Sequence, residues 1–547
     1  MKYFKILLFG LFAVTLNSGL INVPDTGGGI HCIQSGINEA IDGDTVLVAP
    51  GTYYENINFL GKKITVASEY LITGDEDDIE NTIIDGGGND AVVRMESGED
   101  TLSYLCGFVI RNGNNPRGGG ISIYQSGAKL EHLKIRDNLA ESSGAPYGGG
   151  LYADGDVYLQ GYEQIIIRDT EIIDNSVIGN YAVSGGFKIE NRYDLVLLEN
   201  VTISNNTSDA YYYASCGGGY ITGVTNVSLK NCTISNNFST CPESATIGGM
   251  SLSNVVDVQI VNCQIIDNSV EGSWSVGGGL GISATGDVIV RNCLIADNIA
   301  EGEVCGIGGM GMYEGDFLFE DCEFRGNEAA GGTGGMAMTE NCDVILNRVL
   351  FHDNVAEKGA ALTIGRADVL LINSVICNNQ ATLNGGIHFK EPGRFRIVNS
   401  IIWNNGAQEF WIDAPTCVQF QHNIIQYGEG EISCSNGGSY FWGEGNMQSY
   451  PQFVSIGTDD FHLQSSSPGI DSGVNACEKW GAGPYLIPGE DIIGQNRDIG
   501  IYEQGDEDYS FDLPTYLSVD EDVLLNLDLD EYLMGMSGQF SGSCENN

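Results

Sequence analysis

The sequence predicts an all-β protein whose main part is a right-handed parallel β-helix, and three observations carry this prediction. A short apolar strand that closes on a polar pair ending in Asn recurs ten times, at steps of 25 to 37 residues. A pair of glycines and a second apolar strand follow most copies. Apolar and polar residues alternate within each strand, which is the period of a β-strand. Repeats of this length without a helical pattern are typical of solenoids, which bury their core between stacked coils.

The repeated asparagines mark equivalent positions in successive coils. Stacked strands lie about 4.8 Å apart, so equivalent side chains lie directly above one another. We expect the Asn column at a sharp turn, where Asn tolerates a left-handed backbone and its amide bonds to the coils above and below. This predicted structural ladder comprises Asn138, Asn175, Asn206, Asn237, Asn268, Asn298, Asn327, Asn354, Asn379 and Asn405.

A second column lies five residues before each Asn and holds small or medium side chains, as a narrow interior requires. Its members are Leu133, Thr170, Val201, Cys232, Cys263, Cys293, Cys322, Val349, Ser374 and Ser400. We interpret its four cysteines as buried thiols that act as small hydrophobic groups. The chain has 15 cysteines and no C-x-x-C zinc pattern. The remaining candidates for disulfides are Cys216, Cys241 and Cys305 in the variable stretches, and the pair Cys417 and Cys434.

The region before the repeats predicts a lid for the solenoid. In residues 33–41, Ile33, Ile37, Ala40 and Ile41 fall on one face of a short helix. A β-helix end exposes unpaired backbone that needs a cover. The next stretch, DGDTVLVAPGTYYENINFLGKKITVAS followed by NTIIDGGG, resembles the entry region of bacterial pectate-lyase-like β-helix proteins. That resemblance implies the same fold.

Two further resemblances point to surface proteins. SYPQFVS, DFHLQSSSPGIDSG and GQNRDIGIYE, in this order between residues 449 and 503, resemble the closing section of secreted bacterial β-helix proteins of the choice-of-anchor kind. The repeats resemble those of chlamydial polymorphic outer-membrane proteins, which pair FxxN with a GG-plus-apolar motif. Residues 324–327, 351–354 and 334–338 fit that motif, although most copies have Ile in place of Phe. Because one fold serves many functions, these resemblances imply the fold and not the chemistry.

The chain divides into four predicted segments. Residues 1–19 read as a signal peptide, with Lys2 and Lys5 before an apolar run too short to span a bilayer. Residues 20–503 form the β-helix, and residues 504–510 form an acidic linker. Residues 511–547 resemble the opening of a cadherin-like or immunoglobulin-like module, which needs about 100 residues, so we expect an incomplete or disordered segment. The predicted location is secreted, or at the cell surface of a bacterium, with no transmembrane segment in the mature chain.

The net charge of −49 limits the partners. It arises from 73 acidic residues against only 24 Lys and Arg. Without a basic stripe, nucleic acid is excluded as an expected partner. An acidic polysaccharide would be repelled unless a cation bridged it. The expected partner is a polysaccharide or a cell-surface component.

Aromatic residues in the variable stretches between each Asn and the next glycine pair are the candidate ligand-binding residues. They are Tyr181, Tyr211, Tyr212, Tyr213 and Trp274, accompanied by Tyr147 and Phe238. These stretches are expected to emerge as loops on one side of the solenoid, where aromatic faces can stack on sugar rings. The alternative is that these aromatic side chains pack the loops onto the body.

The acidic stretch of residues 74–80 is the candidate metal site. Asp75, Asp77 and Asp78 offer clustered carboxylates to a possible Ca²⁺ ion, the only expected cofactor. The stretch lacks EF-hand spacing, and a solvated charge run is the alternative.

The sequence assigns no catalytic residue. The best basic cluster is His388, Lys390, Arg394 and Arg396, and it is expected to decorate an outer sheet. The pairs Asp77-Asp78 and Asp459-Asp460 lie in predicted loops far from any partner motif. The leading hypothesis is a binding or adhesive role without catalysis. The alternative is a polysaccharide lyase or glycoside hydrolase acting in a groove of the side loops, and a third hypothesis is a structural spacer.

Overall fold

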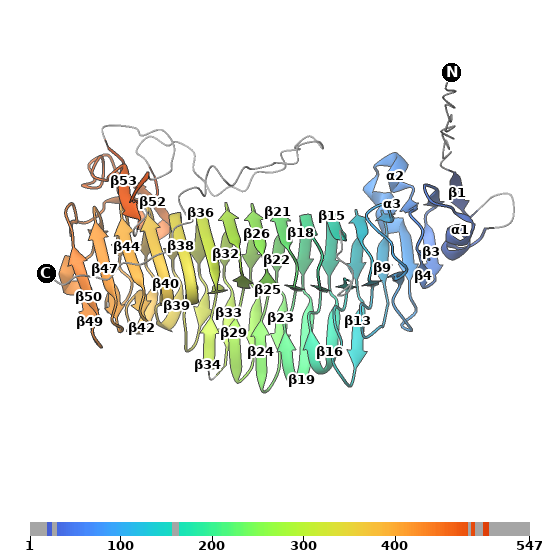
Figure 1. Ribbon diagram of the computed structural model, residues 1–547, viewed down its shortest axis with the longest axis horizontal. Coiled ribbons are helices and arrows are strands. Elements are labelled where there is room, and N and C mark those ends of the chain that lie inside the picture. The colour runs from blue at the N-terminus through green and yellow to red at the C-terminus, as the bar shows by residue number, and fades with distance from the viewer. Residues whose placement is uncertain are drawn as a thin grey trace, which may run out of the picture.

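The computed structural model describes residues 19–24, 30–155, 163–302, 304–479, 483–486 and 496–502. Short strands wind into a long rod of stacked coils, and all pairings between coils are parallel (Figure 1). The predicted parallel β-helix is confirmed. The predicted signal peptide, apart from Gly19, lies outside the described residues, as do the acidic linker and the C-terminal segment.

The coils place 38 strands in one continuous sheet. The strands of the first half are β1 (Leu20–Val23), β2 (Thr45–Val48), β3 (Gly51–Tyr54), β4 (Ile57–Asn58), β5 (Thr65–Ser68), β6 (Thr82–Asp85), β7 (Val93–Met95), β8 (Tyr104–Cys106), β9 (Val109–Arg111), β10 (Ile121–Tyr124), β11 (Ala128–Glu131), β12 (Lys134–Arg136), β14 (Leu151–Asp154), β15 (Gln164–Ile173), β17 (Phe187–Glu190), β18 (Leu195–Ser204), β20 (Gly219–Thr222), β21 (Asn226–Lys230) and β22 (Thr233–Ser235).

The second half of this sheet continues to the last coil. Its strands are β25 (Met250–Val255), β26 (Asp257–Val261), β27 (Gln264–Ile266), β30 (Leu280–Ala284), β31 (Asp287–Arg291), β32 (Leu294–Ala296), β35 (Met310–Tyr313), β36 (Gly315–Arg325), β38 (Met336–His352), β40 (Leu362–Ile372), β41 (Val375–Cys377), β43 (Ile387–Phe389), β44 (Arg394–Val398), β45 (Ile401–Trp403), β46 (Phe410–Ile412), β47 (Cys417–Gln421), β48 (Ile424–Ile425), β49 (Ile432–Cys434) and β50 (Ser439–Trp442).

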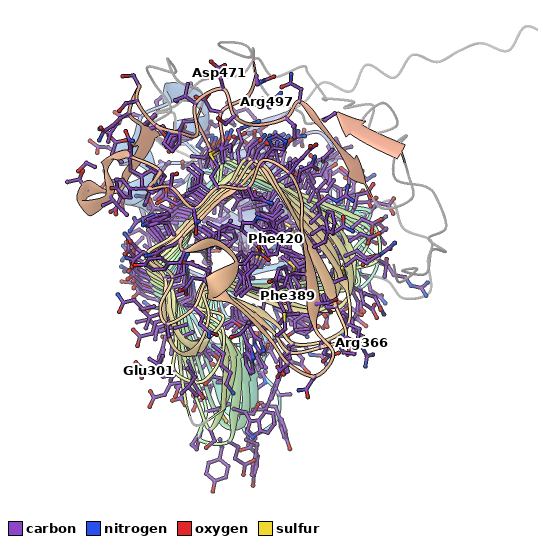
Figure 2. The ribbon with its side chains drawn as sticks, turned by 90° about the vertical axis from the view of Figure 1, so that its left-hand side faces the viewer. Glu301, Arg366, Phe389, Phe420, Asp471 and Arg497 are labelled. Carbon is purple, nitrogen blue, oxygen red and sulfur yellow. The ribbon has the colours of Figure 1, made fainter. Side chains whose placement is uncertain are left out.

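Exact register gives the rod its core. Val196, Val227, Val258, Val288 and Phe317 follow one another in five successive coils and are all buried. Apolar side chains of every coil therefore stack on those of the next, and a single hydrophobic core runs along the interior. Figure 2 shows the coils from one end of the rod, with Phe389 and Phe420 inside them.

The repeated asparagines form a buried hydrogen-bonded column. The Asn237 Nδ2 atom donates to the Ile203 carbonyl of the preceding coil at 2.9 Å and to Asn268 Oδ1 of the next coil at 2.9 Å. The Asn237 backbone N–H donates to the same Oδ1 atom at 3.1 Å. This pattern repeats from Asn138 to Asn379. Each amide thus satisfies backbone groups that the turn leaves unpaired inside the rod.

One detail of the predicted turn is wrong. The left-handed backbone belongs to the residue before each ladder Asn, such as Asn205 (φ 56°), Asp267 (φ 56°) and Asp353 (φ 54°), and not to the ladder Asn itself. The preceding residue turns the chain outward and is exposed or half-buried. The ladder Asn then points inward with an extended backbone, which leaves its amide free to bridge the coils.

A glutamate terminates the ladder at its C-terminal end. Glu409 accepts hydrogen bonds from the Asn405 Nδ2 atom at 2.7 Å and from the Asn405 backbone N–H at 3.3 Å, so its carboxylate replaces the next asparagine. Burial raises the pKa of Glu409 to about 7, against the hydrogen bonds from Asn405 that lower it. This carboxyl group is therefore poised to titrate near neutral pH inside the rod.

The second column is buried as predicted, and its side chains also make hydrogen bonds. The Cys232 backbone N–H donates to Cys263 Sγ at 3.4 Å, as Val349 N–H donates to Ser374 Oγ at 3.1 Å. Burial raises the pKa values of Cys232, Cys263 and Cys293 well above that of an exposed thiol, which makes them unreactive. The other candidates Cys216, Cys241, Cys417 and Cys434 are free thiols, and the side chain of Cys305 lies outside the described residues.

The variable stretches are not loops but a second parallel sheet, which we call the fin. It projects from the rod along residues 139–384, as the lower edge of Figure 1 shows. The chain runs out along one leg after each Asn and returns along another, and each leg pairs with its counterpart in the next coil. The fin strands are β13 (Leu139–Ser142), β16 (Ser176–Val183), β19 (Thr207–Ser215), β23 (Phe238–Thr240), β24 (Ser244–Ile247), β28 (Ser269–Glu271), β29 (Trp274–Gly277), β33 (Ile299–Glu301), β34 (Val304–Ile307), β37 (Glu328–Ala329), β39 (Val355–Lys358) and β42 (Gln380–Asn384).

Small residues keep the fin thin. Its legs enclose a separate core made mostly of alanine, with Ala140, Ala182, Ala214, Ala245 and Ala300 all buried. At the neck, where the fin joins the rod, a glycine at the end of most returning legs lies against the backbone of the next outgoing leg along the chain. A Cβ atom on Gly248 would lie 2.5 Å from the carbonyl oxygens of Ser269 and Gly278. The glycine pairs are therefore required where the two legs meet at the rod.

The N-terminal end carries the expected lid. Helix α1 (Ile33–Glu39) buries Ile33 and Ile37 against the first coil, and Ala40 is buried beside it (Figure 1). Ile41 was expected on the same face, but it lies beyond the end of the helix and is exposed. Two further short helices, α2 (Tyr70–Thr73) and α3 (Glu76–Asn81), leave the rod between β5 and β6.

The C-terminal part folds back on the flank of the last coils. Within the predicted 20–503 span, the parallel strands end at Trp442, after the short helix η1 (Gly428–Glu431). We call residues 451–502 the flap; it contains β51 (Phe453–Ser455), η2 (Ile456–Thr458), β52 (Asp460–Leu463), β53 (Ala476–Lys479) and β54 (Gly483–Leu486), and both strand pairs are antiparallel. Phe453, Phe461 and Ile499 of the flap pack on outward-facing Val375 and Ile401 of the coils. Figure 2 shows Asp471 and Arg497 of the flap outside the coils.

Candidate functional site

The aromatic residues predicted to bind ligand lie on the fin, and most of them are open to solvent. Tyr211, Tyr181 and Tyr212 are 65%, 51% and 41% exposed, and Trp274 is 62% exposed. Tyr212 contacts Tyr211 edge-on, with ring centroids 4.7 Å apart, and Tyr181 at 5.7 Å. The three rings form an aromatic cluster supplied by two neighbouring coils. We call these three tyrosines and Trp274 the fin aromatics.

Register extends the aromatic surface along the returning legs. Tyr181 pairs with Tyr213, which pairs with Ser244, which pairs with Trp274. Trp274 therefore lies two coils from Tyr213, or roughly 10 Å along the rod. Tyr213 is less exposed than the fin aromatics and belongs to the same column. These aromatic residues follow one column along the long axis, with Ser244 between Tyr213 and Trp274.

The opposite legs of the fin carry negative charge. One outward-facing column of the outgoing legs, aligned by strand register, holds Glu141, Asp209, Glu271 and Glu301, all exposed, with Ile178 and Thr240 between them. Figure 2 shows Glu301 on the fin side of the rod and Arg366 elsewhere on its surface. The outgoing legs therefore present a mainly acidic column, whereas the returning legs carry Tyr181, Tyr213 and Trp274.

Two other aromatic residues of the variable stretches are committed to packing. Tyr147 stacks on Tyr152 and covers the Lys188 ammonium, which lies 3.8 Å from the Tyr147 ring centroid. Lys188 is buried and forms an ion pair with Glu190 at 2.7 Å. Phe238 is half-buried in the outgoing leg of β23. Tyr147 and Phe238 therefore pack against the protein, as the alternative to ligand binding predicted.

The carboxylates predicted to bind Ca²⁺ have local structural roles. Asp75 is the N-cap of α3, where its side chain accepts a hydrogen bond from the Asp77 backbone N–H at 3.1 Å. Asp78 accepts from Thr73 Oγ1 at 2.6 Å. Asp77 and Asp78 lie in the first turn of the helix, where negative charge is favourable. These acidic residues therefore cap and flank the start of α3, and their carboxylate oxygens do not converge on a shared metal position.

The basic cluster predicted on an outer sheet is largely paired. Arg394 forms an ion pair with Asp368, and Arg396 donates to Gln419 Oε1. His388 is buried and stacks on Trp411, with ring centroids 4.3 Å apart. Burial lowers the pKa of His388 to about 4. Arg394 and Arg396 are therefore held by neighbours and do not present a base to a bound substrate.

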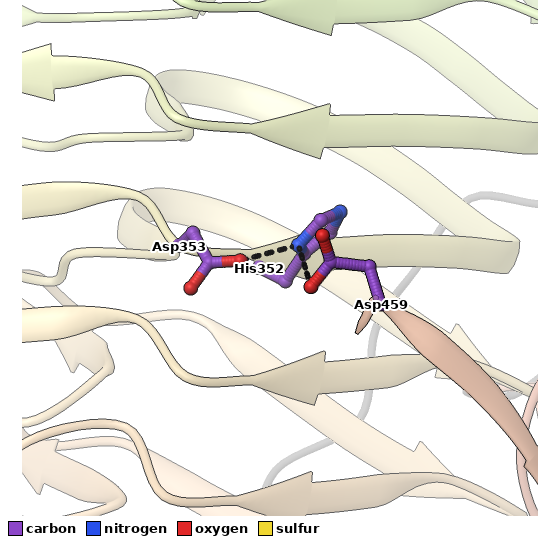
Figure 3. Close-up of side chains that lie close together, drawn as sticks. All are labelled: His352, Asp353 and Asp459. Atoms are coloured by element: carbon purple, nitrogen blue, oxygen red, sulfur yellow. Dashed lines mark hydrogen bonds and ion pairs between the residues drawn. The ribbon is translucent and has the colours of Figure 1, made fainter. Parts of the chain in front are cut away.

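One cluster of chemistry-bearing side chains was missed by sequence reasoning. Buried His352 lies at the end of β38, and its Nδ1 atom is 2.7 Å from Asp353 Oδ2 and 3.8 Å from Asp459 Oδ1 of the flap (Figure 3). Its Nε2 atom is 2.9 Å from Glu323 Oε1. Burial disfavours the charged imidazole, but Asp353 and Glu323 outweigh it and raise the pKa of His352 to about 9. The pair Asp459-Asp460, expected far from any partner, supplies one member of this cluster.

No helix in the part of the chain that the structure describes is both long and apolar enough to cross a membrane.

Comparison with known proteins supports the fold. A family model described as "Right handed beta helix region" matches residues 119–302, a span that holds the first six ladder asparagines, Asn138 to Asn298, and the fin aromatics. The crystal structure of pectate lyase Pel9A matches over 89% of this chain and 96% of that chain, with 13% identity and a TM-score of 0.30; a likeness of this size carries no argument. A search of curated protein sequences gives no match. The strand periodicity, the parallel coils and the family match agree that the chain folds as a right-handed parallel β-helix.

Proposed function

We propose that this protein is a secreted or cell-surface β-helix protein of a bacterium that binds a polysaccharide or another cell-surface component through the fin. The observation that carries this proposal is the group of solvent-exposed fin aromatics Tyr181, Tyr211, Tyr212 and Trp274. Large aromatic side chains placed in water gain nothing for the fold. Exposed apolar surface that is gathered in one place is typical of a binding site.

The geometry of the fin suits a long, repeating ligand. Returning legs are about 4.8 Å apart, and their aromatic residues follow one line through Tyr181, Tyr213 and Trp274. An extended chain of sugars can place successive rings along such a line, with its apolar faces on the aromatic rings. Behind these aromatic residues, the two legs of the fin pack on each other through a small core made mostly of alanine.

Charge favours a neutral ligand. The formal net charge of −49 and the acidic column of the outgoing legs repel polyanions at low ionic strength. Uronic-acid polymers would need a bridging cation at this surface. We therefore infer that a neutral glycan is the preferred ligand class.

The alternative function is a polysaccharide lyase or glycoside hydrolase that works in a groove beside the fin. Its candidate base is buried Lys188 in β17, which follows the glycine pair Gly185-Gly186 at the fin neck and lies beside Tyr152 and Glu190. Its ammonium group is paired with Glu190 and covered by Tyr147, so a proton-abstracting role would require both contacts to open. The arrangement gives the binding role the stronger support.

The test is retention of the full chain in gels that contain a panel of neutral and acidic polysaccharides. The proposal expects retention by at least one neutral polysaccharide. The triple variant Tyr181→Ala, Tyr211→Ala and Tyr212→Ala should weaken binding at least about tenfold, because stacked aromatic anchors dominate such contacts. Trp274→Ala should weaken binding to long chains more than binding to short oligomers.

A matched control separates the fin from exposed aromatics in general. Tyr54 is exposed like the fin tyrosines but lies on β3, near the N-terminal lid, so Tyr54→Ala should leave retention unchanged. Equal losses in the control and the triple variant would contradict the proposal. Release of unsaturated products or new reducing ends during the same incubations, with or without Ca²⁺, would favour the enzymatic alternative.

A further inference from the structure

The cluster around His352 has the dimensions of a metal site. The His352 Nδ1 atom and one carboxylate oxygen each of Asp353 and Asp459 all lie within 4.8 Å of one another. The two distances from Nδ1 are 2.7 Å and 3.8 Å. Ligands bound to zinc at 2.0–2.2 Å in a tetrahedral arrangement are about 3.3 Å apart. The observed spacing brackets this value, so small side-chain adjustments would enclose an ion.

A hydrogen bond on the far side of the ring orients His352 for this role. Its Nε2 atom is 2.9 Å from Glu323 Oε1, and Glu323 is in turn held by Arg325 at 3.3 Å. Histidines that bind metals usually donate their second ring N–H to a carboxylate, which fixes the tautomer and the ring orientation. Here that contact directs Nδ1 toward Asp353 and Asp459, as Figure 3 shows.

The chemistry of the donors selects the class of ion. One imidazole nitrogen and two carboxylates form a mixed N and O set, which suits zinc or a similar divalent transition metal. Calcium and magnesium prefer all-oxygen sets with more ligands. Asp353 and Asp459 have His352 as their only cationic partner among the described residues. Both carboxylates are exposed and His352 is buried, so an ion can enter from solvent and water can complete its coordination.

We propose that His352, Asp353 and Asp459 bind a zinc ion, or a chemically similar divalent ion, that clasps the flap to the β-helix. His352 and Asp353 belong to the coil at the end of β38, whereas Asp459 lies between η2 and β52 of the flap. Phe461, two residues later, packs edge-on against the His352 ring at 5.2 Å. The ion would displace the Nδ1 proton to solvent, replace the direct contact of Nδ1 with Asp353 and join two parts of the chain that are distant in sequence.

The experiment is isothermal titration of the full chain with ZnCl₂ after treatment with a chelator, repeated for Asp353→Asn and Asp459→Asn. The wild type should bind one equivalent of zinc at this site, and each variant should bind it at least about tenfold more weakly. Glu323→Gln, which removes only the orienting carboxylate, should weaken zinc binding about 10–100-fold. Zinc should also raise the melting temperature of the wild type and not of the two aspartate variants.

The coil repeat itself provides controls for folding and specificity. Asp353→Asn introduces the residue that Asn205, Asn236 and Asn378 supply at the same left-handed position of other coils, so the coil should keep its fold. Asp267 occupies the equivalent position three repeats before Asp353 and has an exposed side chain. The substitution Asp267→Asn should therefore leave zinc binding unchanged. Absence of zinc binding to the wild type, or equal binding in the wild type, Asp353→Asn and Asp459→Asn, would overturn the proposal and leave the cluster as an ion-pair network.

Discussion

The rod and the fin are built from the same repeat, yet they use their side chains in opposite ways. In the rod, a column of buried asparagines bonds each coil to the next, and large apolar side chains fill the interior. In the fin, alanines form a thin core, while large tyrosines and a tryptophan face solvent. The same repeat therefore places large side chains differently in the two regions. In the rod they are buried and stabilise the core, and in the fin they are exposed to solvent.

The largest loss of stability is expected in the ladder. Asn237→Ala removes two donor contacts and leaves the buried Asn206 backbone N–H without its acceptor. Because each unsatisfied buried group costs about 1–3 kcal/mol, the free energy of unfolding should fall by roughly 3 kcal/mol. Urea unfolding measures it. Asn226→Ala, an exposed asparagine of the same coil, should cost less than about 0.5 kcal/mol; equal losses would break the contrast between buried ladder and surface.

The ladder end should make stability depend on pH. The folded pKa of Glu409 is raised to about 7 from an ordinary value of 4.5, so the folded state holds a proton that the unfolded state releases. This contribution is fully present below the unfolded pKa and is lost as pH rises through 7. Between about pH 5.5 and pH 8 the loss should be about 2 kcal/mol.

Glu409→Gln isolates this effect from the general charge of the protein. The variant should lose less stability than the wild type over the same pH interval, because glutamine does not titrate. The same urea series at the two pH values measures both proteins. Parallel pH profiles would show that Glu409 is not protonated in the folded state.

The neck of the fin should tolerate no side chain. Gly248→Ala brings a Cβ atom within 2.5 Å of two carbonyl oxygens, and the backbone must move, at an expected cost of about 1–3 kcal/mol. Gly430 has open space around its Cα atom, so Gly430→Ala should be nearly neutral. In the Gly248→Ala variant, the backbone amides of the fin should also exchange hydrogen faster than those of the rod. Equal exchange in the fin and the rod would contradict a separate neck.

The smallest effect on stability is expected for the fin aromatics. Tyr211→Ala removes an exposed side chain that touches only Tyr212 among the aromatic rings that the structure describes. The free energy of unfolding should change by less than about 0.5 kcal/mol. A melting-temperature comparison with the wild type checks this expectation. A large loss would mean that the tyrosines support the fin rather than serve a ligand.

The sequence predicts the rod well because its signals are periodic. The fixed spacing of the repeat predicted that Asn237 and Cys232 lie in buried columns. Because the strands are in register, the same prediction applied to the equivalent residues of all ten copies. The fin escaped prediction because its inward positions are Ala, Ser or Val, such as Ala140, Ser208 and Ser239, which do not stand out from the polar residues around them. The glycine pairs were visible, but their role at the neck depends on a leg that varies in length.

Some residues of the candidate sites could likewise be predicted from the sequence, and others could not. Tyr181 and Trp274 were found because aromatic residues are conspicuous in polar stretches, although their alignment required the register of the fin. The link between His352 and Asp459 was not predictable, since it depends on the flap returning to the flank of the rod. Asp75 was predicted from charge alone, and its capping role became apparent only with the start of α3.

The most direct test of the division between rod and fin is the dissociation constant for a retained neutral polysaccharide, measured together with the melting temperature. The comparison uses the wild type, the fin triple variant and Tyr54→Ala. The account predicts that the triple variant keeps the melting temperature of the wild type and binds at least about tenfold more weakly, while Tyr54→Ala matches the wild type in both. Unchanged affinity of a folded triple variant would contradict the assignment of binding to the fin.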